Sequence, residues 1–192
     1  MGTIKIAISG AHSTGKTTYL NKLTELLNST EIKYKTVGDL AITCPLPILK
    51  KHTIESTLWI AARGILEEIE AENDAAVVLV DRPILDCWAY FNFVCKGRYS
   101  DNNPKLKTLI GMIENWLPTY DLILQTVINN DIPIEDDKGR DLNPAYRKQI
   151  GDEMVRGAKR FRIEPKYLEY ENREEKVQSV FNFIRKQPSI SN

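Results

Sequence analysis

The sequence predicts an α/β fold in which a five-stranded parallel sheet carries helices on both faces. Short apolar runs, typical of buried strands, alternate along the chain with longer amphipathic segments, which are typical of helices. A glycine-rich loop separates the first apolar run from the first amphipathic segment. With 192 residues, 42% of them hydrophobic, the chain can bury one substantial core, which favours a single domain.

Five short runs are predicted to be strands. Four of them are expected to be buried on both faces of the sheet, and residues 34–37 are a candidate fifth strand. The five runs span residues 4–9, 34–37, 76–80, 120–126 and 166–170. Because strands and helices alternate along the chain, we expect the strands to run parallel.

Amphipathic segments between the strands predict helices. Residues 54–72 form a long example before the third strand, and residues 106–117 and 173–184 repeat the pattern. In residues 16–27 the apolar side chains share one helical stripe, which consists of Tyr19, Leu20, Leu23, Leu26 and Leu27.

We expect a single domain over residues 1–186 and a flexible tail over residues 187–192. Residues 129–142 are polar and contain proline and glycine, which is typical of a mobile loop. This loop is expected to belong to a basic lid over residues 129–162.

Composition excludes several classes of protein. Lys plus Arg and Asp plus Glu number 26 each, so no overall field attracts nucleic acid or an anionic membrane. The three cysteines are an odd number without Cys-x-x-Cys spacing, which argues against a disulfide framework and a zinc site. The N-terminal apolar stretch is too short for a secretion signal or a membrane span. We therefore expect a cytoplasmic protein that does not bind membranes.

The glycine-rich loop over residues 10–17 matches the phosphate-binding pattern Gly-x-x-x-x-Gly-Lys-Thr, between a strand and a helix. Its glycines let successive N–H groups point at phosphates. Lys16 supplies a full charge to the β- and γ-phosphates, and the Thr17 hydroxyl is placed to ligate Mg²⁺. The pattern therefore predicts ATP and Mg²⁺ as cofactors. The expected cofactor-binding residues are Gly10, His12, Ser13, Thr14, Gly15, Lys16, Thr17 and Thr18.

His12 stands inside this loop, and its titration range would suit an acid or a base. Interior positions of such loops contribute mainly backbone N–H groups. We therefore expect the His12 side chain to face solvent or to cap the helix.

A second acidic site follows the apolar run over residues 76–80, which ends at Asp81. A carboxylate there is delivered to the phosphate side of the sheet, where it would orient Mg²⁺ or its water. The alternative is that Asp81 caps the helix expected after Pro83.

The segment over residues 81–86, followed by Ala89-Tyr90, resembles the Asp-Arg or Glu-Arg segment of thymidylate kinases and deoxynucleoside kinases. The whole chain resembles the NadR-type AAA-domain ATPases, relatives of the ribosylnicotinamide kinase domain. This resemblance rests on residues 13–18, 44–47, 58–60, 81–82 and 133–140. It implies a P-loop nucleoside- or nucleotide-kinase-like fold.

The resemblance also implies roles around the acceptor. Kinases of this group place an acidic residue after the second strand to contact the acceptor hydroxyl, and Asp39 stands there where glutamate is more usual. The alternative for Asp39 is a solvent-facing turn. Arg63 corresponds to a helix arginine that holds the acceptor in thymidylate kinases, or is an ordinary surface arginine. Asp86 is a second candidate for positioning the acceptor, and Arg82 would balance charge.

Residues 140–162 are rich in arginine and lysine. A lid that closes on a phosphoryl-transfer site brings cations to the transferred group and excludes water. Arg140 and Arg147 lie two helical turns apart and are the candidates for this role. The alternative is a solvated basic helix.

Together these features predict an ATP- and Mg²⁺-dependent phosphotransferase acting on a nucleoside- or nucleotide-like small molecule. The expected catalytic residues are Lys16, Asp39, Asp81, Arg82, Arg140 and Arg147. ATP is preferred to GTP because of the resemblance and because no Asn-Lys-x-Asp motif appears. The acceptor and the oligomeric state stay open, with a homodimer among the alternatives.

Two alternative functions are also consistent with the sequence. The first is a nucleotide-binding switch, since the fold alone does not settle catalysis. The second, weaker because the charge is balanced, is a kinase of a hydroxymethyl pyrimidine in DNA. A basic segment over residues 156–162 would hold the strand, and bases would stack on Trp88, Tyr90, Phe91 and Phe93.

Overall fold

The structure is a computed structural model that describes residues 2–129, 142–187 and 190. Arg140, nearly all of the predicted mobile loop and most of the predicted tail lie outside the described residues. Within the part of the chain that is described, no helix has the length and apolar character needed to cross a membrane.

Five parallel strands form one sheet, as predicted, in the order β2-β3-β1-β4-β5. Residue Ile8 of β1 pairs with Asp81 of β3 on one side and with Leu124 of β4 on the other. The carboxyl ends of these three strands therefore lie side by side, where ligands bind in open α/β sheets. The strands are β1 (Ile4–Ser9), β2 (Tyr34–Val37), β3 (Val77–Asp81), β4 (Leu122–Thr126) and β5 (Lys166–Leu168).

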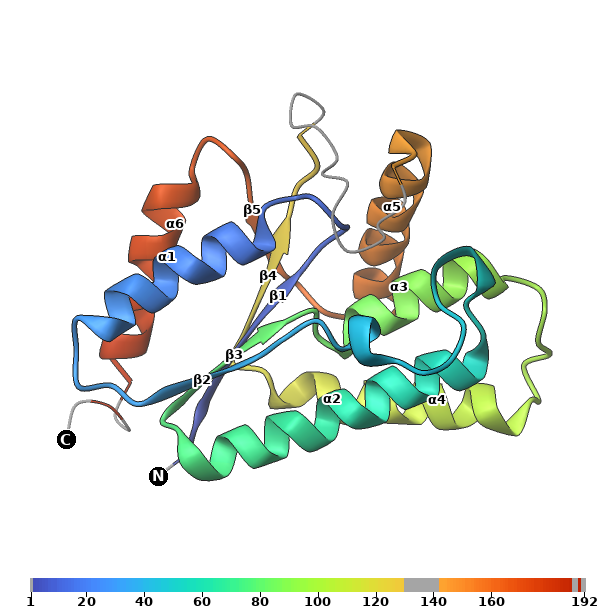
Figure 1. Cartoon of the computed structure of the whole chain (residues 1–192), viewed down its shortest axis with the longest axis horizontal. Coiled ribbons are helices and arrows are strands. Elements are labelled where there is room, and N and C mark those ends of the chain that lie inside the picture. The colour runs from blue at the N-terminus through green and yellow to red at the C-terminus, as the bar shows by residue number, and fades with distance from the viewer. Residues whose placement is uncertain (1, 130–141, 188–189, 191–192) are drawn as a thin grey trace.

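Helices cover both faces of this sheet, as Figure 1 shows. Helices α1 and α6 pack on one face, and α2, α3 and α4 pack on the other. Helix α5 packs against α3. The helices are α1 (Lys16–Asn28), α2 (Ile54–Asp74), α3 (Ile84–Cys95), α4 (Pro104–Trp116), α5 (Pro144–Arg160) and α6 (Arg173–Arg185).

The three inner strands β1, β3 and β4 are buried on both faces because successive side chains enter two different cores. The edge strands β2 and β5 each have only one buried residue, so the expectation that residues 166–170 are buried on both faces is wrong. Ile6 and Ile8 of β1 join the core beneath α1 and α6, whereas Ala7 joins the core beneath α2, α3 and α4. In β3, Leu79 joins the core beneath α1 and α6, and Val80 joins the core beneath α2, α3 and α4. This explains why β1 and β3 are nearly continuous apolar runs in the sequence.

Local capping explains two helix starts. Thr53 and Ser56 form a reciprocal capping box at the start of α2. The Asn103 side chain accepts hydrogen bonds from Lys105 N and Leu106 N, so α4 begins at Pro104, two residues before the predicted start.

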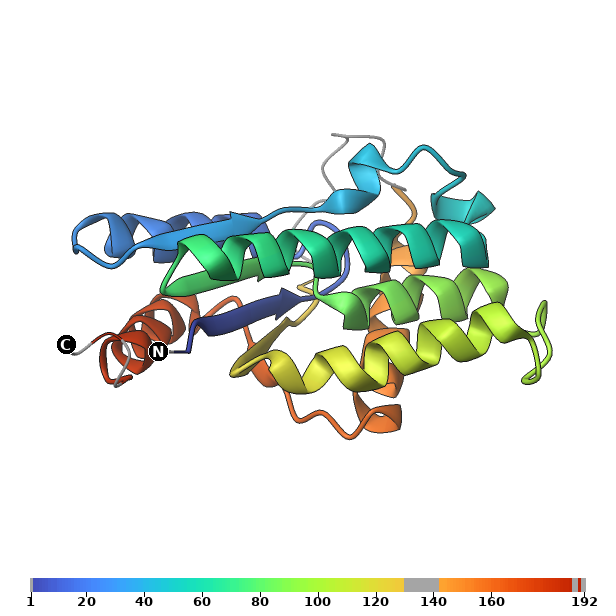
Figure 2. The same cartoon turned by 90° about the horizontal axis from the view of Figure 1, so that it is seen from below.

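The connection from β2 to α2 forms a wall over the ligand-binding edge of the sheet. It contains two short 3-10 helices, η1 (Leu40–Thr43) and η2 (Leu49–Lys51). In Figure 2 this connection runs alongside α2. It completes a cavity of about 770 Å³ between the phosphate loop, α2 and α3.

Candidate nucleotide-binding site

The phosphate loop turns between β1 and α1, with two glycines where a side chain does not fit. Gly15 has a φ of 81°, in the left-handed region that favours glycine. A Cβ atom at Gly15 would lie 2.6 Å from a guanidinium nitrogen of Arg173. A Cβ atom at Gly10 would overlap the Thr126 hydroxyl. The spacing of the loop in the sequence therefore reflects contacts with β4 and α6 as well as backbone curvature.

Lys16 is buried at the start of α1 and points back along the loop. Its ammonium donates hydrogen bonds to Gly10 O (2.8 Å) and Ala11 O (2.6 Å). Burial, and next the positive charge of Arg82, lower the pKa of Lys16, while the Asp81 and Asp86 carboxylates raise it. An anionic ligand beside this ammonium would relieve the cost of burying its charge.

Asp86 lies beneath the loop as a buried carboxylate. It accepts hydrogen bonds from Ser9 Oγ (2.5 Å) and Gly10 N (3.3 Å), and Arg82 Nη1 lies 3.7 Å away. Burial raises the pKa of Asp86, opposed mainly by Arg82 and Lys16. Asp86 lines the cavity, and these bonds also make it an anchor of the phosphate loop.

Arg82 links the end of β3 to the segment after β2. Its Nε donates to Asp39 Oδ2 (2.6 Å), and its Nη1 donates to Tyr90 Oη (3.2 Å). Its φ of 70° is unusual for a residue other than glycine. Such strain persists where surrounding contacts enforce it, and it is concentrated at functional sites.

Asp39 is half-buried, so the alternative of a solvent-facing turn is wrong. Its Oδ1 accepts a hydrogen bond from Ala41 N (3.1 Å) at the start of η1, and its Oδ2 is paired with Arg82. The physical reason is the sheet order, because β2 and β3 are neighbours and bring the residues after them together. The Asp39 carboxylate lines the same cavity as Lys16.

Asp81 and Thr17 meet at the mouth of the phosphate loop, where Thr17 Oγ1 lies 3.5 Å from Asp81 Oδ2. Asp81 Oδ1 is buried and has no hydrogen-bond partner among the described residues. A carboxylate oxygen without a partner beside a hydroxyl fits the oxygen ligands that Mg²⁺ prefers. The alternative role as a helix cap is wrong, because α3 begins at Ile84 with Pro83 as its N-cap residue and has no side-chain cap.

Helix α5 covers the outer side of the loop, so the expectation that His12 faces solvent is wrong. His12 is buried, and its ring lies 5.9 Å from that of Tyr146 on α5. Arg147 is also buried, and its Nη1 donates to Ser13 O over 3.4 Å. The structure thus brings Arg147 to the loop backbone rather than leaving it on a solvated helix.

Arg63 is not brought to the cavity, contrary to the expectation that it holds the acceptor. Its side chain is exposed and its Nε pairs with Glu67 Oε1 at 2.9 Å. The cavity-lining face of α2 includes Ala61 and Gly64. At 100° per residue, Arg63 lies 160° around the helix axis from Ala61, and it is not among the residues that line the cavity.

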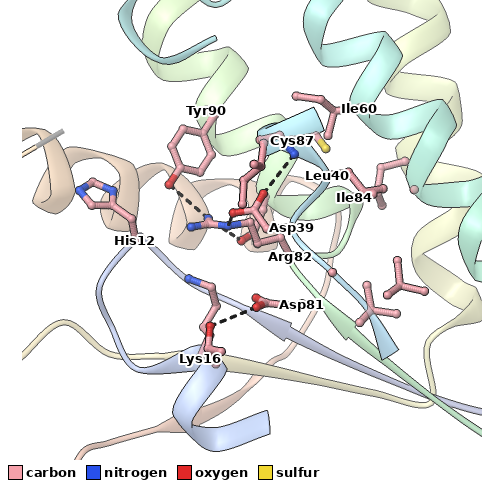
Figure 3. A pocket seen from close by; sticks show the side chains of 18 of the residues that line it. His12, Lys16, Asp39, Leu40, Ile60, Asp81, Arg82, Ile84, Cys87 and Tyr90 are labelled. Carbon is pink, nitrogen blue, oxygen red and sulfur yellow. Dashed lines mark hydrogen bonds and ion pairs between the residues drawn. The ribbon is translucent and has the colours of Figure 1, made fainter. Parts of the chain in front are cut away.

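The cavity has a phosphate end and an inner chamber. Figure 3 shows Lys16 and Asp81 at the phosphate end, and the Asp39–Arg82 pair between them and the apolar residues Leu40, Ile60 and Ile84. We define the inner chamber as the part of the cavity lined by Asp39, Leu40, Ile42, Ile60, Ile65, Glu68, Val80, Arg82, Ile84, Asp86 and Cys87.

Two cavity residues were missed by the sequence analysis. Arg173 lies over Gly15, and its guanidinium carbon stacks 4.8 Å from the ring centroid of Tyr170. One feature of the sequence could have drawn attention to Arg173. It stands in the first turn of a predicted helix, where a positive charge is unfavourable to the helix dipole.

The aromatic residues proposed to stack on DNA bases make contacts within the protein. Trp88 and Phe91 are buried in the core, and Phe93 packs edge-on against Tyr146. The Tyr90 hydroxyl contacts Arg82. The four residues therefore do not form one exposed surface for bases, because α3 buries Trp88 and Phe91 in the core, while the partly buried Tyr90 lines the cavity.

The strand order together with the loop between β1 and α1 defines a P-loop, kinase-like α/β fold. A family model described as an AAA domain matches residues 5–176. The chain therefore belongs to this AAA-domain family. None of the curated proteins compared with the chain matches it.

Solved structures of kinase-like proteins share the fold. The structure of NadR protein in complex with NAD and AMP-PNP has a TM-score of 0.69 and 14% identity, covering 96% of this chain. This chain spans 50% of the NadR chain. Deoxyadenosine kinase from M. mycoides with bound dCTP has a TM-score of 0.64 and 14% identity, covering 94% of this chain and 100% of the kinase. Thymidylate kinase from Ehrlichia chaffeensis has a TM-score of 0.60 and 16% identity, and the match covers 94% of this chain and 99% of that kinase.

Proposed function

We propose that this protein is an ATP- and Mg²⁺-dependent phosphotransferase that moves the γ-phosphate to a nucleoside- or nucleotide-like small molecule. The observation that carries this proposal is that one cavity of about 770 Å³ is lined both by the phosphate loop and by the Asp39–Arg82 pair. A phosphate-binding group and a candidate proton acceptor thus open into the same space, as a transfer between two bound molecules requires.

At the phosphate end, Lys16 would exchange the carbonyl oxygens of Gly10 and Ala11 for phosphate oxygens of ATP. The loop N–H groups and the N-terminus of α1 would add partial positive charge. Arg147 holds Ser13 O and would keep the loop in its binding conformation. These groups would orient the γ-phosphate toward the inner chamber.

Thr17 and Asp81 would hold Mg²⁺, since the buried Asp81 Oδ1 lacks a partner among the described residues. When bound, the ion would neutralise charge on the β- and γ-phosphates. Asp86 would act indirectly, because it fixes Gly10 N at the start of the loop.

At the acceptor end, Asp39 would accept the proton of the attacking hydroxyl. Arg82 holds Asp39 Oδ2, and Ala41 N holds Asp39 Oδ1, so the carboxylate is fixed but keeps lone pairs for a further hydrogen bond. General base catalysis of this kind contributes typically about 10²–10⁴-fold to a rate. Arg82 is therefore a positioning residue for Asp39.

The molecules bound to the similar structures agree with this proposal. The NadR structures contain NAD and AMP-PNP or NR, and the deoxyadenosine kinase structure contains dCTP. These ligands belong to those proteins, and they support a nucleotide donor and a nucleoside-type acceptor for this chain.

The test is transfer of labelled γ-phosphate from Mg-ATP to a panel of nucleosides, deoxynucleoside monophosphates, nicotinamide riboside and DNA that contains hydroxymethyl pyrimidines. We expect labelling of one small-molecule class, which Lys16→Ala and Asp81→Ala both abolish. Tight ATP binding with only slow hydrolysis for every acceptor would contradict the proposal and favour a nucleotide-binding switch.

A further inference from the structure

The inner chamber contains more negative than positive side chains. Its carboxylates belong to Asp39, Asp86 and Glu68, and Arg82 is the single cation among its described residues. The other two described cations of the cavity, Lys16 and Arg173, lie at the phosphate loop. His52, which also lines the cavity, is neutral at physiological pH because burial lowers its pKa to about 4.

The Arg82 guanidinium already forms ion pairs and hydrogen bonds with other groups of the protein. Asp39 Oδ2 lies 2.6 Å from its Nε and Asp86 Oδ2 lies 3.7 Å from its Nη1. The same Nη1 approaches Gly10 O (3.4 Å) and Tyr90 Oη (3.2 Å). The Arg82 side chain is 14% exposed, so two carboxylates compensate its charge with little screening by solvent.

Glu68 marks the end of the chamber along α2. Its carboxylate accepts hydrogen bonds from Trp116 Nε1 (2.8 Å), Tyr120 Oη (2.8 Å) and Lys5 Nζ (3.3 Å). Lys5 also pairs with Glu72, so its charge is shared between two carboxylates behind the chamber. Within the described part of the chain, this end of the chamber therefore offers a bound acceptor no uncompensated positive charge.

A nucleoside monophosphate carries about −1.5 to −2 charges at neutral pH, as any phosphomonoester does. Sites that bind such groups supply arginines or lysines that contact the phosphate directly. Arg63 was the candidate for this task, and its side chain points away from the cavity and pairs with Glu67. Of the side chains that the structure describes, a phosphate in the chamber would therefore face Asp39 and Asp86 with only the compensated Arg82 nearby.

We propose that the inner chamber binds an uncharged nucleoside-type molecule and that the group phosphorylated is its hydroxyl, not the phosphate of a nucleoside monophosphate. The chamber walls support this substrate class, since Leu40, Ile60 and Ile84 offer an apolar surface suited to a base ring. This inference rests on the proposed phosphotransferase function and narrows its acceptor.

The reaction balances without another reactant. The acceptor hydroxyl oxygen forms a bond to the γ-phosphorus, and the bond from that phosphorus to the β,γ-bridging oxygen breaks. The hydroxyl proton passes to Asp39, which lines the chamber, and ADP leaves with the bonding electron pair. The products are a phosphomonoester and ADP.

The experiment compares each common nucleoside and deoxynucleoside with its own 5′-monophosphate, at equal concentration and pH 8. Labelled phosphate transfer from Mg-ATP gives kcat/KM, and equilibrium dialysis with a non-hydrolysable ATP analogue gives the affinity of each member of a pair. We expect at least one nucleoside to exceed its monophosphate by about tenfold or more in both measurements, which corresponds to about 1.4 kcal/mol.

Arg63→Ala supplies a second readout, with Arg98→Ala as an exposed arginine control on another segment. Both variants should leave the acceptor KM unchanged within about twofold. A rise of about tenfold or more in the acceptor KM for Arg63→Ala alone would show that Arg63 reaches the acceptor and would overturn the inference.

The outcomes separate this inference from the proposed function. Equal or better transfer to monophosphates overturns the inference and leaves the phosphotransferase standing. Preferential nucleoside binding without transfer supports the charge argument and contradicts the phosphotransferase. Failure of every nucleoside to bind overturns the inference.

Discussion

Arg82 Nε donates a hydrogen bond to Asp39 Oδ2 over 2.6 Å, although the two residues are 43 positions apart in the chain. The pair exists because β2 and β3 are adjacent strands, whose carboxyl ends deliver Asp39 and Arg82 to one edge of the sheet. It fixes a carboxylate beside the phosphate loop, and the same Arg82 also contacts Gly10 O. The donor and acceptor ends of the cavity are thus joined through one side chain.

The first prediction concerns Asp39 as the proton acceptor. Asp39→Asn should lower kcat by about 10²–10⁴-fold, because the amide cannot take up the hydroxyl proton. Binding of Mg-ATP should stay within about threefold, since Asp39 does not contact the phosphate loop directly. Steady-state kinetics and titration with a fluorescent ATP analogue measure the two quantities. Asp101→Asn, on an exposed turn, is the matched control, and an unchanged kcat for Asp39→Asn would contradict the role.

The second prediction concerns Asp81 and Mg²⁺. Asp81→Asn should raise the Mg²⁺ concentration needed for half-maximal nucleotide binding by about tenfold or more, since the ion loses a charged ligand. Without Mg²⁺ the variant should be at least as stable as the wild type, because Asp81 Oδ1 is buried without a partner among the described residues. Magnesium titrations and denaturant unfolding in EDTA test both statements.

Thr17 offers a companion pair of variants for the same site. Thr17→Ser keeps the hydroxyl that approaches Asp81, whereas Thr17→Val keeps the shape and removes it. Only Thr17→Val should repeat the magnesium defect. Equal magnesium dependence in the two variants would argue against ligation by this hydroxyl.

The third prediction separates backbone strain from contact at Gly15. Gly15 and Gly97 have similar φ values of 81° and 75°, but a Cβ atom meets Arg173 only at Gly15 and has open space at Gly97. Both alanine variants should lose about 1 kcal/mol of stability, the cost of a left-handed conformation for a residue with a Cβ atom. Only Gly15→Ala should also lose ATP affinity, because it displaces Arg173 from the loop. Calorimetric ATP titrations measure this, and an equal loss for Gly97→Ala would refute the contact argument.

The fourth prediction is an acid-sensitive contribution from His52. Burial lowers the pKa of His52 from 6.5 to about 4, and its Nε2 lies 2.7 Å from Thr57 Oγ1. Between these pH values the unfolded chain binds a proton that the folded chain does not, so the free energy of unfolding falls as the pH falls. Full protonation would cost about 3 kcal/mol relative to pH 7.5.

The matched variant is His52→Gln, which retains a side-chain nitrogen for Thr57 but does not titrate. Urea unfolding at pH 7.5 and pH 4.5 should show a smaller loss of stability for His52→Gln than for the wild type. Parallel losses in the two proteins would mean that His52 is not the group responsible.

Much of the fold follows from short-range patterns. β1 covers the predicted residues 4–9 because every side chain in this run is buried, and the apolar ones enter one of the two cores. The predicted helix over residues 54–72 begins at Ile54 and extends to Asp74. By contrast, the strand predicted over residues 120–126 begins at Leu122, because Tyr120 ends the preceding 3-10 helix η3 (Leu117–Thr119).

The sequence by itself determined the parallel α/β architecture and the position of the phosphate loop, since strand burial, helix periodicity and the glycine spacing are properties of neighbouring residues. Tertiary structure alone decided which side chains meet. It paired Asp39 with Arg82, turned Arg63 away, and brought Arg147 to Ser13 across 134 positions. Such contacts depend on strand order, helix rotation and packing between distant elements, which no local pattern of residues encodes.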